Sequence, residues 1–306
     1  MSAVHVWDAD AVRASVSMSR AIEVVREAFV GFGAGEFELP VRTALDDGKI
    51  LVMSAFHRAS GTAAVKTVSV DLDRRPAVQG TVSFVAASGA TTVADAPSIT
   101  ALRTGAVVGV ATDALAPADA SHLVLIGLGG QAADQLRAIR AVRPIRSVTL
   151  VERDLTHAQE FRGTFADALD GLDVALSSDP DVAVRDADVV CCATPSRTPL
   201  FAADSLPEWA HVNAIGAFRP AMRELPDELL ATAYVVVDQR EAALEEAGEI
   251  IHALGAGSMT ERDLTELSEL LADPGRAPSG GRTVFKSVGL AIQDWAVARV
   301  LMEAIS

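Results

Sequence analysis

The segment Leu123-Val124-Leu125-Ile126-Gly127-Leu128-Gly129-Gly130-Gln131-Ala132 carries the strongest structural signal in this chain of 306 residues. An apolar run typical of a buried strand leads into the pattern Gly-x-Gly-x-x-Ala, and a helix is expected to begin directly after it. Gly127 permits a tight turn, Gly129 lets the backbone approach a pyrophosphate, and Ala132 lets the helix lie close to the strand. The helix N-terminus favours anions. The segment, including Gly130 and Gln131, therefore predicts a dinucleotide-binding turn.

Strands and helices alternate on the C-terminal side of this turn. This alternation predicts a doubly wound parallel sheet of the Rossmann type, with strands at residues 122–127, 147–152, 174–177, 188–193, 212–215 and 234–238. Glu152 ends the second of these strands, where an acid typically binds the adenosine ribose hydroxyls and favours NAD. Arg153 follows directly and could instead hold the 2′-phosphate of NADP. Both cofactors therefore stay open, with NAD slightly favoured.

The N-terminal third of the chain has a different pattern. An amphipathic helix over residues 17–35 precedes four short strand-like runs separated by turns, at 41–45, 50–56, 63–70 and 80–87, which predict an antiparallel sheet. A long helix rich in small residues follows from Pro97 to about Leu115, and an apolar helix over 288–305 closes the chain. We expect that last helix to pack back on the first domain. The predicted class is α/β, with a Rossmann domain (117–284) inserted in a discontinuous α+β domain (1–116 and 285–306).

Composition narrows the classes of function. Half of the residues are hydrophobic and the formal net charge is −15, so a large core is expected and a nucleic-acid backbone would be repelled. No apolar run reaches the roughly 18 residues of a membrane span, and the N-terminus shows no signal-peptide pattern. We therefore expect a soluble cytoplasmic protein with no nucleic-acid or membrane partner. The two cysteines, Cys191 and Cys192, are adjacent, which predicts neither a disulfide nor a metal site.

Three cationic residues stand in apolar surroundings within the N-terminal domain. Arg42 and Lys66 lie in strand-like runs, and Arg103 lies in the helix of small residues. A buried cation is costly unless it is paired. One interpretation is a pocket for a substrate carboxylate, which arginine binds bidentately, with Lys66 lending a proton to the reacting centre. The alternative is an internal ion pair with Glu or Asp, or a side chain that reaches the surface. Because three such residues occur in one domain, we favour the pocket.

At these residues the chain resembles the ornithine cyclodeaminase/μ-crystallin family, and the resemblance covers nearly its whole length. Several specific segments occur in the family's order, which makes an accidental likeness improbable. They are VKTVSV at 65–70, ITALRTGA at 99–106, the glycine turn, ATPS at 193–196, VNAIGA at 212–217, RELPDELL at 223–230, VDQREAALEEAGE at 237–249 and FKSVGLAIQD at 285–294.

The resemblance implies a homodimer with a Rossmann domain and a discontinuous domain for substrate binding and dimerisation. It also implies NAD(P)-dependent chemistry on small amino or imino acids: ornithine cyclodeaminase, alanine dehydrogenase or reduction of cyclic ketimines. Carried over by motif, Arg42, Lys66 and Arg103 would line the substrate site, with Lys66 catalytic. The cofactor would contact the glycine turn together with Thr104, Thr194, Ser196, Ser287, Val288 and Gly289.

One departure from the family pattern bears on the subclass. Ornithine cyclodeaminases carry an acid shortly after Val-Asn-Ala-x-Gly, and Phe218 occupies that position here. Without the carboxylate, the amino group of ornithine loses its expected partner and base. The Phe-Arg-Pro version is closer to the μ-crystallin and pyrroline-2-carboxylate reductase branch. We therefore expect NAD(P)H-dependent reduction of a cyclic imino acid, most simply Δ1-pyrroline-2-carboxylate to L-proline.

Several alternatives stay open. They are a six-membered imine as substrate, a cyclodeaminase that uses another acid such as Asp73, an alanine or other amino-acid dehydrogenase, and a non-catalytic nucleotide- or small-ligand-binding protein. His57, His211 and His252 are candidates for a general acid, although lone histidines are more often structural.

Overall fold

The computed structural model describes residues 4–305 and contains two compact units. One unit comprises the chain up to Val107 together with the stretch from Leu290 onward, and the other comprises Val108–Gly289. The boundaries expected at residues 116/117 and 284/285 differ from these for physical reasons. The first break lies inside helix α3 (Ala96–Leu115), and the second follows a strand that is hydrogen-bonded within the second unit. No helix among residues 4–305 is long and apolar enough to cross a membrane.

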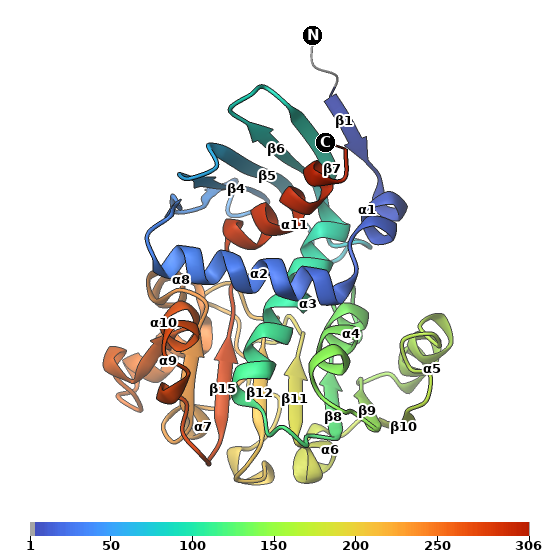
Figure 1. Cartoon of the computed structure of the whole chain (residues 1–306). Coiled ribbons are helices and arrows are strands. Elements are labelled where there is room, and N and C mark those ends of the chain that lie inside the picture. Colours follow the sequence, from blue (N-terminus) through green and yellow to red (C-terminus); the bar gives the residue numbers. More distant parts are fainter. Residues whose placement is uncertain (1–3, 306) are drawn as a thin grey trace. The chain divides into compact units, whose positions relative to one another are not determined.

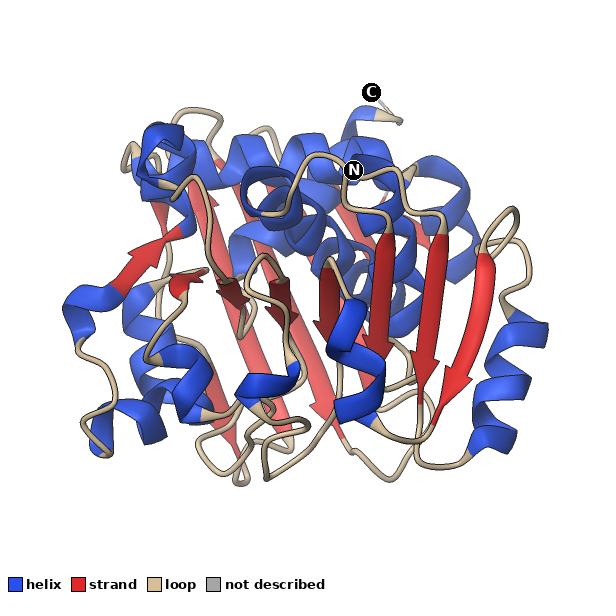
Figure 2. Ribbon diagram, turned by 90° about the horizontal axis from the view of Figure 1, so that it is seen from below, coloured by secondary structure: helices blue, strands red, loops and turns tan. Residues whose placement is uncertain are grey.

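The second unit is built around an eight-stranded sheet in which every neighbouring pair is parallel (Figure 2). Its central strands are almost entirely buried and mostly apolar, as expected for strands covered on both faces, although they also bury His211, Asn213 and Lys286. The predicted doubly wound sheet is thereby confirmed. In spatial order the strands are β10 (Asp173–Ser177), β9 (Ser147–Val151), β8 (His122–Ile126), β11 (Val189–Cys192), β12 (His211–Ala214), β15 (Thr283–Lys286), β13 (Tyr234–Val237) and β14 (Leu264–Glu266).

Short helices connect these strands. They are α4 (Ala132–Val142), α5 (Leu155–Thr164), α6 (Pro180–Ala183), α7 (Asp227–Leu230), α8 (Arg240–Glu246), α9 (Gly248–Gly255) and α10 (Leu267–Ala272), with 3-10 turns at Val184–Asp186, Ala203–Ser205, Glu261–Asp263 and Pro274–Arg276. Helix α4 begins at the glycine turn, where the sequence pattern predicts a helix start.

Strand β15 lies between β12 and β13, although it is the last strand in the sequence (Figure 1). Phe285 is in register with Asn213 on one side and Val236 on the other. The pattern of residues 283–285 predicts an extended segment, but it contains no information on which strands would flank it. This insertion puts the residues after Lys286 at the carboxyl edge of the sheet, where doubly wound folds bind their ligands.

The first unit contains a seven-stranded mixed sheet. Its order is β1 (Val4–Trp7), β7 (Thr91–Asp95), β6 (Val78–Ala86), β5 (Thr62–Val70), β4 (Ile50–His57) and β2 (Phe37–Glu38), with β3 (Thr43–Leu45) also paired to β4. The expected antiparallel pairing holds for β3 to β7, whereas β1 pairs with β7 in parallel. Along β5, buried residues alternate with more exposed ones, so Lys66 lies on the buried face.

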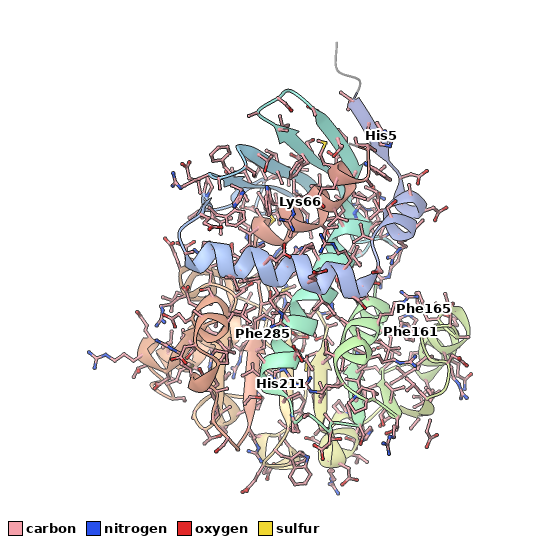
Figure 3. The ribbon with its side chains drawn as sticks, in the orientation of Figure 1. His5, Lys66, Phe161, Phe165, His211 and Phe285 are labelled. Atoms are coloured by element: carbon pink, nitrogen blue, oxygen red, sulfur yellow. The ribbon has the colours of Figure 1, made fainter. Side chains whose placement is uncertain are left out.

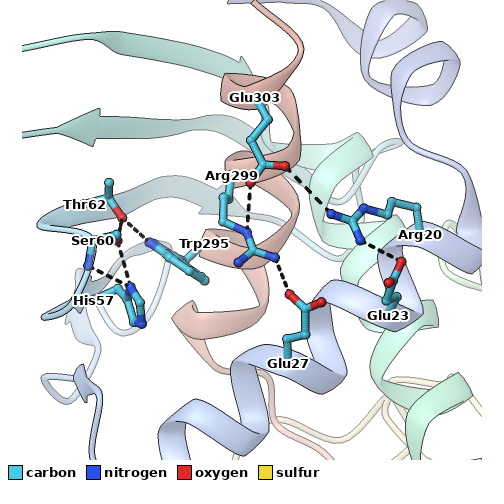
Figure 4. Close-up of polar contacts among 9 residues, drawn as sticks. All are labelled: Arg20, Glu23, Glu27, His57, Ser60, Thr62, Trp295, Arg299 and Glu303. Atoms are coloured by element: carbon cyan, nitrogen blue, oxygen red, sulfur yellow. Dashed lines mark hydrogen bonds and ion pairs between the residues drawn. The ribbon is translucent and has the colours of Figure 1, made fainter. Parts of the chain in front are cut away.

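Helices α1 (Ala9–Ser15) and α2 (Met18–Gly33) lie in the same unit, and α2 confirms the predicted amphipathic helix. The C-terminal helix α11 (Ala291–Glu303) packs against α2 and against the buried face of this sheet. Trp295 Nε1 donates to Thr62 Oγ1 at 2.9 Å, and Arg299 pairs with Glu27 of α2 at 2.5 Å (Figure 4). The last helix therefore returns to the N-terminal unit, as its apolar pattern indicates.

Helix α3 is capped at both ends. At its start, Asp95 Oδ2 accepts hydrogen bonds from the backbone N–H and the hydroxyl of Ser98, at 2.9 and 2.6 Å. At its end, the buried guanidinium of Arg143 donates to the carbonyl oxygens of Asp113, Ala116 and Pro117. These carbonyls have no partner within the helix, so Arg143 satisfies them.

Candidate functional site

Two buried cations share one buried carboxylate in the first unit. Lys66 Nζ lies 3.2 Å from Asp294 Oδ1, and Arg103 Nε lies 3.4 Å from the same oxygen. Lys66 is labelled in Figure 3. The side chains of Lys66 and Asp294 are 3% and 1% exposed. Arg103 also donates to the side-chain oxygen of Gln293. The internal ion pair that the sequence left as an alternative is therefore present, and its acid is Asp294.

The charges in this cluster do not balance. Lys66 and Arg103 carry two positive charges against the single negative charge of Asp294, and the half-buried Arg42 is close enough to influence Lys66. Burial lowers the pKa of Lys66 to about 8; the attraction of Asp294 opposes this, and the repulsion of Arg103 and Arg42 adds to it. A cluster with surplus positive charge in a poorly solvated position favours an anion.

Three buried polar atoms of the cluster make no hydrogen bond within residues 4–305: Asp294 Oδ2, the amide nitrogen of Gln293 and Arg103 Nε. Arg103 Nε has its ion-pair contact with Asp294, so Asp294 Oδ2 and the Gln293 amide nitrogen are the two without a partner of any kind. Buried polar atoms are normally satisfied, so such atoms are candidates for ligand contacts. Sequence analysis missed both residues because they lie in a segment dominated by apolar side chains. The available signal was the pair Gln293-Asp294 itself, since these two adjacent polar residues interrupt the otherwise apolar run of residues 288–298.

The glycine turn lies in the second unit and has the geometry that its sequence predicts. Gly127 has φ +89°, and a Cβ there would lie 2.6 Å from Thr194 Cγ2, so only glycine fits. Around Gly129 and Gly130 there is open space for a Cβ. The N–H groups of residues 129–131 donate no hydrogen bond within the part of the chain that the structure describes. Three free donors at the start of α4 suit the phosphates of a dinucleotide.

Glu152 extends from the end of β9 to the glycine turn. One carboxylate oxygen accepts from the N–H of Leu128 at 3.3 Å, and the other accepts from the N–H of Arg153 at 2.9 Å. The ring of His157 lies 3.6 Å away. The Glu152 carboxylate is thus held beside the turn, where it can accept hydrogen bonds from the ribose hydroxyls of a dinucleotide. Arg153, in contrast, is exposed. These residues fit a dinucleotide.

The other residues expected at the cofactor have intramolecular partners for their hydroxyls. Thr194 donates to Glu224, Ser196 to the carbonyl of Thr198, and Ser287 to Asp238. Thr104 lies on α3 in the first unit and donates to the carbonyl of Thr100. Their oxygen atoms can still accept a hydrogen bond, but their donated bonds serve the local structure.

The buried carboxylate of Asp238, at the carboxyl edge of the parallel sheet, is the second feature that the sequence pattern did not reveal. Asp238 Oδ2 accepts from Ser287 Oγ and from the N–H groups of Val288 and Gly289, at 2.8 to 2.9 Å. Gly289 has φ +86°. The C-terminal helix therefore begins at Ala291 and not at Val288 as expected, because these N–H groups bind Asp238 before the helix starts.

The loop after β12 carries Phe218, at the position where the resemblance leads us to expect the acid of ornithine cyclodeaminases. Phe218 is partly buried against the core of the second unit, and the Arg219 guanidinium lies 5.4 Å from its ring centre. Asp73, the conceivable substitute, is exposed in a turn of the first unit, where its N–H donates to Asp71.

The three candidate histidines have separate local roles. His57 contacts Ser60 at 2.7 Å and His252 contacts Asp227 at 2.8 Å. His211 is fully buried beside Thr283, and burial lowers its pKa to about 3. It is therefore uncharged near neutral pH and has no proton to offer there as an imidazolium.

The glycine turn, the carboxylate of Glu152 beside it and the parallel sheet define a dinucleotide-binding protein of the Rossmann class. The model of the ornithine cyclodeaminase/mu-crystallin family matches residues 4–306, and the chain belongs to this family.

Similar proteins include both reductases and a dehydrogenase. The Δ1-pyrroline-2-carboxylate reductase of Bacillus cereus is 33% identical, over 97% of this chain and 95% of that protein. The structure of the Thermococcus litoralis Δ1-pyrroline-2-carboxylate reductase in complex with NADH and L-proline matches with a TM-score of 0.92 at 30% identity, covering 98% of this chain and 97% of that one. An archaeal alanine dehydrogenase dimer with bound NAD matches with a TM-score of 0.89 at 33% identity, covering 98% and 95%.

Proposed function

We propose that this protein is an NAD(P)H-dependent reductase of cyclic imino acids, with Δ1-pyrroline-2-carboxylate, reduced to L-proline, as the simplest substrate. The observation that carries the proposal is the surplus of positive charge at Lys66 and Arg103, which share the single carboxylate of Asp294. A small imino acid brings the carboxylate that this cluster lacks. The similarity to two reductases of the same imine supports the choice of substrate.

In this proposal the substrate carboxylate binds to Arg103 and Arg42. A guanidinium binds a carboxylate through two parallel hydrogen bonds, which also fixes the plane of the ring. Gln293 orients Arg103 through its side-chain oxygen, leaving its amide nitrogen available to the ligand. Fixed orientation of the imine is a large part of the rate enhancement expected for such a reaction.

Lys66 is the proposed proton donor. With a pKa of about 8 it is about nine-tenths protonated at pH 7, yet it releases its proton more readily than an ordinary lysine. The proton goes to the imine nitrogen, and the cofactor, when bound, supplies the hydride to the imine carbon. Asp294 keeps Lys66 charged between turnovers, because its attraction opposes the effect of burial.

The glycine turn with residues 129–131 would hold the pyrophosphate, and Glu152 would hold the adenosine ribose. The carboxylate of Glu152 would repel a 2′-phosphate, so NADH is the favoured cofactor. Arg153 is the residue through which NADPH would be accepted. Thr104, Thr194, Ser196, Ser287 and Gly289 remain proposed cofactor contacts through their oxygen atoms or backbone.

A direct assay tests the proposal. Purified protein is mixed with Δ1-pyrroline-2-carboxylate and NADH, then NADPH, and cofactor oxidation is followed by absorbance. L-Ornithine with NAD is the parallel reaction, scored by release of ammonia. Fast cofactor oxidation without ammonia supports the reductase. Ammonia and proline from ornithine overturn the interpretation of Phe218, and L-alanine oxidation without imine reduction favours the dehydrogenase that the archaeal neighbour suggests.

Lys66→Met tests the proton donor, with Lys49→Met as the control because Lys49 is exposed and pairs with the equally exposed Asp46. The Lys66 variant should lose about 100-fold or more in turnover and keep its NADH affinity. In the wild type, turnover should fall as the pH rises through about 8, since the proton donor is then lost. Unchanged turnover in the Lys66 variant removes this residue from the mechanism.

We further propose that the first unit binds substrate and forms a homodimer through the open face of its sheet. This face is opposite to the one that carries Lys66, and it exposes Val6, Phe56, Val65 and Val85. An exposed apolar patch of this kind marks an interface. Val85→Asp should give a monomer in light scattering, whereas Val30→Asp, on exposed α2 surface, should not; a monomeric wild type contradicts the proposal.

We place the protein in the cytoplasm, where NAD(P)H is available.

A further inference from the structure

One fully buried carboxylate holds together the loops that follow β11 and β12. Glu224 Oε1 accepts hydrogen bonds from the N–H of Thr194 at 2.7 Å and from its hydroxyl at 3.0 Å. Glu224 Oε2 accepts from the N–H groups of Gly216 and Ala217, at 2.7 and 3.1 Å. All four donors are supplied by two loops that are remote from each other in sequence. A single side chain thus determines how these loops lie against each other.

Thr194 is also enclosed by two glycines. A Cβ at Gly127 would lie 2.6 Å from Thr194 Cγ2, and a Cβ at Gly216 would lie 2.2 Å from both the nitrogen and the oxygen of Thr194. No side chain fits at either glycine without displacing backbone or the Thr194 methyl. The glycine turn, the Thr194 loop and the loop after β12 are therefore in direct backbone contact within the second unit.

The backbone of Ala217 is held on both sides, at its N–H and at its carbonyl. Its N–H donates to Glu224, and its carbonyl accepts from Lys286 Nζ, which pairs with Glu249 at 2.9 Å. Lys286 and Glu249 are both 0% exposed. Ala217 directly precedes Phe218, the residue that we expect to distinguish the chain from cyclodeaminases. Buried charged side chains therefore fix the course of the backbone directly before Phe218.

We propose that Glu224 is a positioning residue that couples the dinucleotide-binding turn to the Phe218 loop through Thr194. The inference rests on the proposed function, since it assigns a purpose to these loops at the cofactor site. A carboxylate is required, because its two oxygens accept four hydrogen bonds and offer no competing donor. A glutamine at this position would turn an NH2 group toward two of the four donors.

The test compares Glu224→Gln with Glu228→Gln. Glu228 lies four residues further on, and its side chain is exposed. NADH dissociation constants are measured by fluorescence titration, and turnover and KM are measured with the imino acid. Glu224→Gln should raise the NADH dissociation constant about tenfold or more and lower turnover, with little change in the imino-acid KM. Glu228→Gln should behave as the wild type.

A second pair of variants covers the case in which Glu224→Gln does not fold. Thr194→Val keeps the shape and removes the hydroxyl bond to Glu224, so it should weaken NADH binding by about three- to tenfold. Thr194→Ser should restore it. Wild-type NADH affinity in Thr194→Val, or in a folded Glu224→Gln, overturns the inference.

Hydrogen exchange without cofactor separates this inference from the proposed function. The amides of Gly216 and Ala217 should be protected in the wild type and lose protection in Glu224→Gln or, should that variant not fold, in Thr194→Val. A wild-type protein that binds no NAD(P)H overturns the proposed function and the coupling to it, whatever the exchange result. If the wild-type protein binds NADH but the amides of Gly216 and Ala217 stay protected in the variant, only the positioning role of Glu224 is overturned.

Discussion

Replacing Asp294 by Asn removes the negative charge that Lys66 and Arg103 share, while keeping the size of the side chain. Arg103 cannot shed its proton and stays charged without its carboxylate. Lys66 can shed its proton, and because its pKa is already about 8 with Asp294 present, this costs at most about 1 kcal/mol at pH 7. Loss of one partner from a buried ion pair typically costs about 3–5 kcal/mol. Because neutralisation of Lys66 limits part of that cost, we expect the free energy of unfolding to fall by about 2–4 kcal/mol.

Urea denaturation followed by circular dichroism measures this loss, with Glu303→Gln as the control. Glu303 lies on the same helix, is 54% exposed, and pairs with Arg299 at 3.5 Å and Arg20 at 3.8 Å (Figure 4). Its loss should cost under about 1 kcal/mol, since exposed pairs contribute little. An Asp294→Asn protein as stable as the control would refute the reasoning.

The loss of stability caused by Asp294→Asn, called the deficit below, should also depend on pH. The folded pKa of Lys66 lies below its ordinary value of 10.5, so the unfolded chain binds more protons in this window and stability rises with pH from about 8 to 10.5. In the variant the pKa of Lys66 is lower still, because the attraction of Asp294 is gone and the repulsion of Arg103 remains. The variant therefore starts to gain stability at a lower pH than the wild type. The deficit should be larger at pH 6 than at pH 9, and a deficit independent of pH would contradict this account.

Three further predictions concern the second unit. The folded pKa of His211, about 3, lies below its ordinary 6.5, so stability is lost as the pH falls through this window, by about 2 kcal/mol at pH 5. Urea titrations at pH 5 and pH 7 should show this loss in the wild type and not in His211→Asn. Arg143→Met should lower the unfolding free energy by about 2–4 kcal/mol, because the carbonyls of Asp113, Ala116 and Pro117 each lose a hydrogen bond from the guanidinium, and only Pro117 among them keeps a backbone donor that the described residues show, the N–H of Ala120. Arg146→Met, at an exposed position, should change it little. Burial raises the pKa of both Cys191 and Cys192, so a thiol reagent should react with neither in the native protein at pH 8 and with both after denaturation.

Features with a local physical cause were predictable from the sequence. The glycine turn is one, because glycines directly after an apolar strand permit the positive φ and the close backbone approach that such a turn needs. The amphipathic α2 is another, since its apolar period matches the turn of a helix. The burial of Lys66 was indicated by the strand-like run around it, which is otherwise nearly free of charge. In each case neighbouring residues contain all the information that the prediction needs.

The partners of these residues were decided by the tertiary structure alone. Asp294 is 228 positions from Lys66, and Glu224 is 30 positions from Thr194. The same holds for β15, whose extended pattern is local but whose place between β12 and β13 depends on chain segments remote in sequence. A carboxylate that satisfies distant donors leaves no periodic trace in its own surroundings, because its position is determined by which elements pack together. The sequence therefore determined which residues could do the chemistry, and the folded chain decided which charges hold them in place.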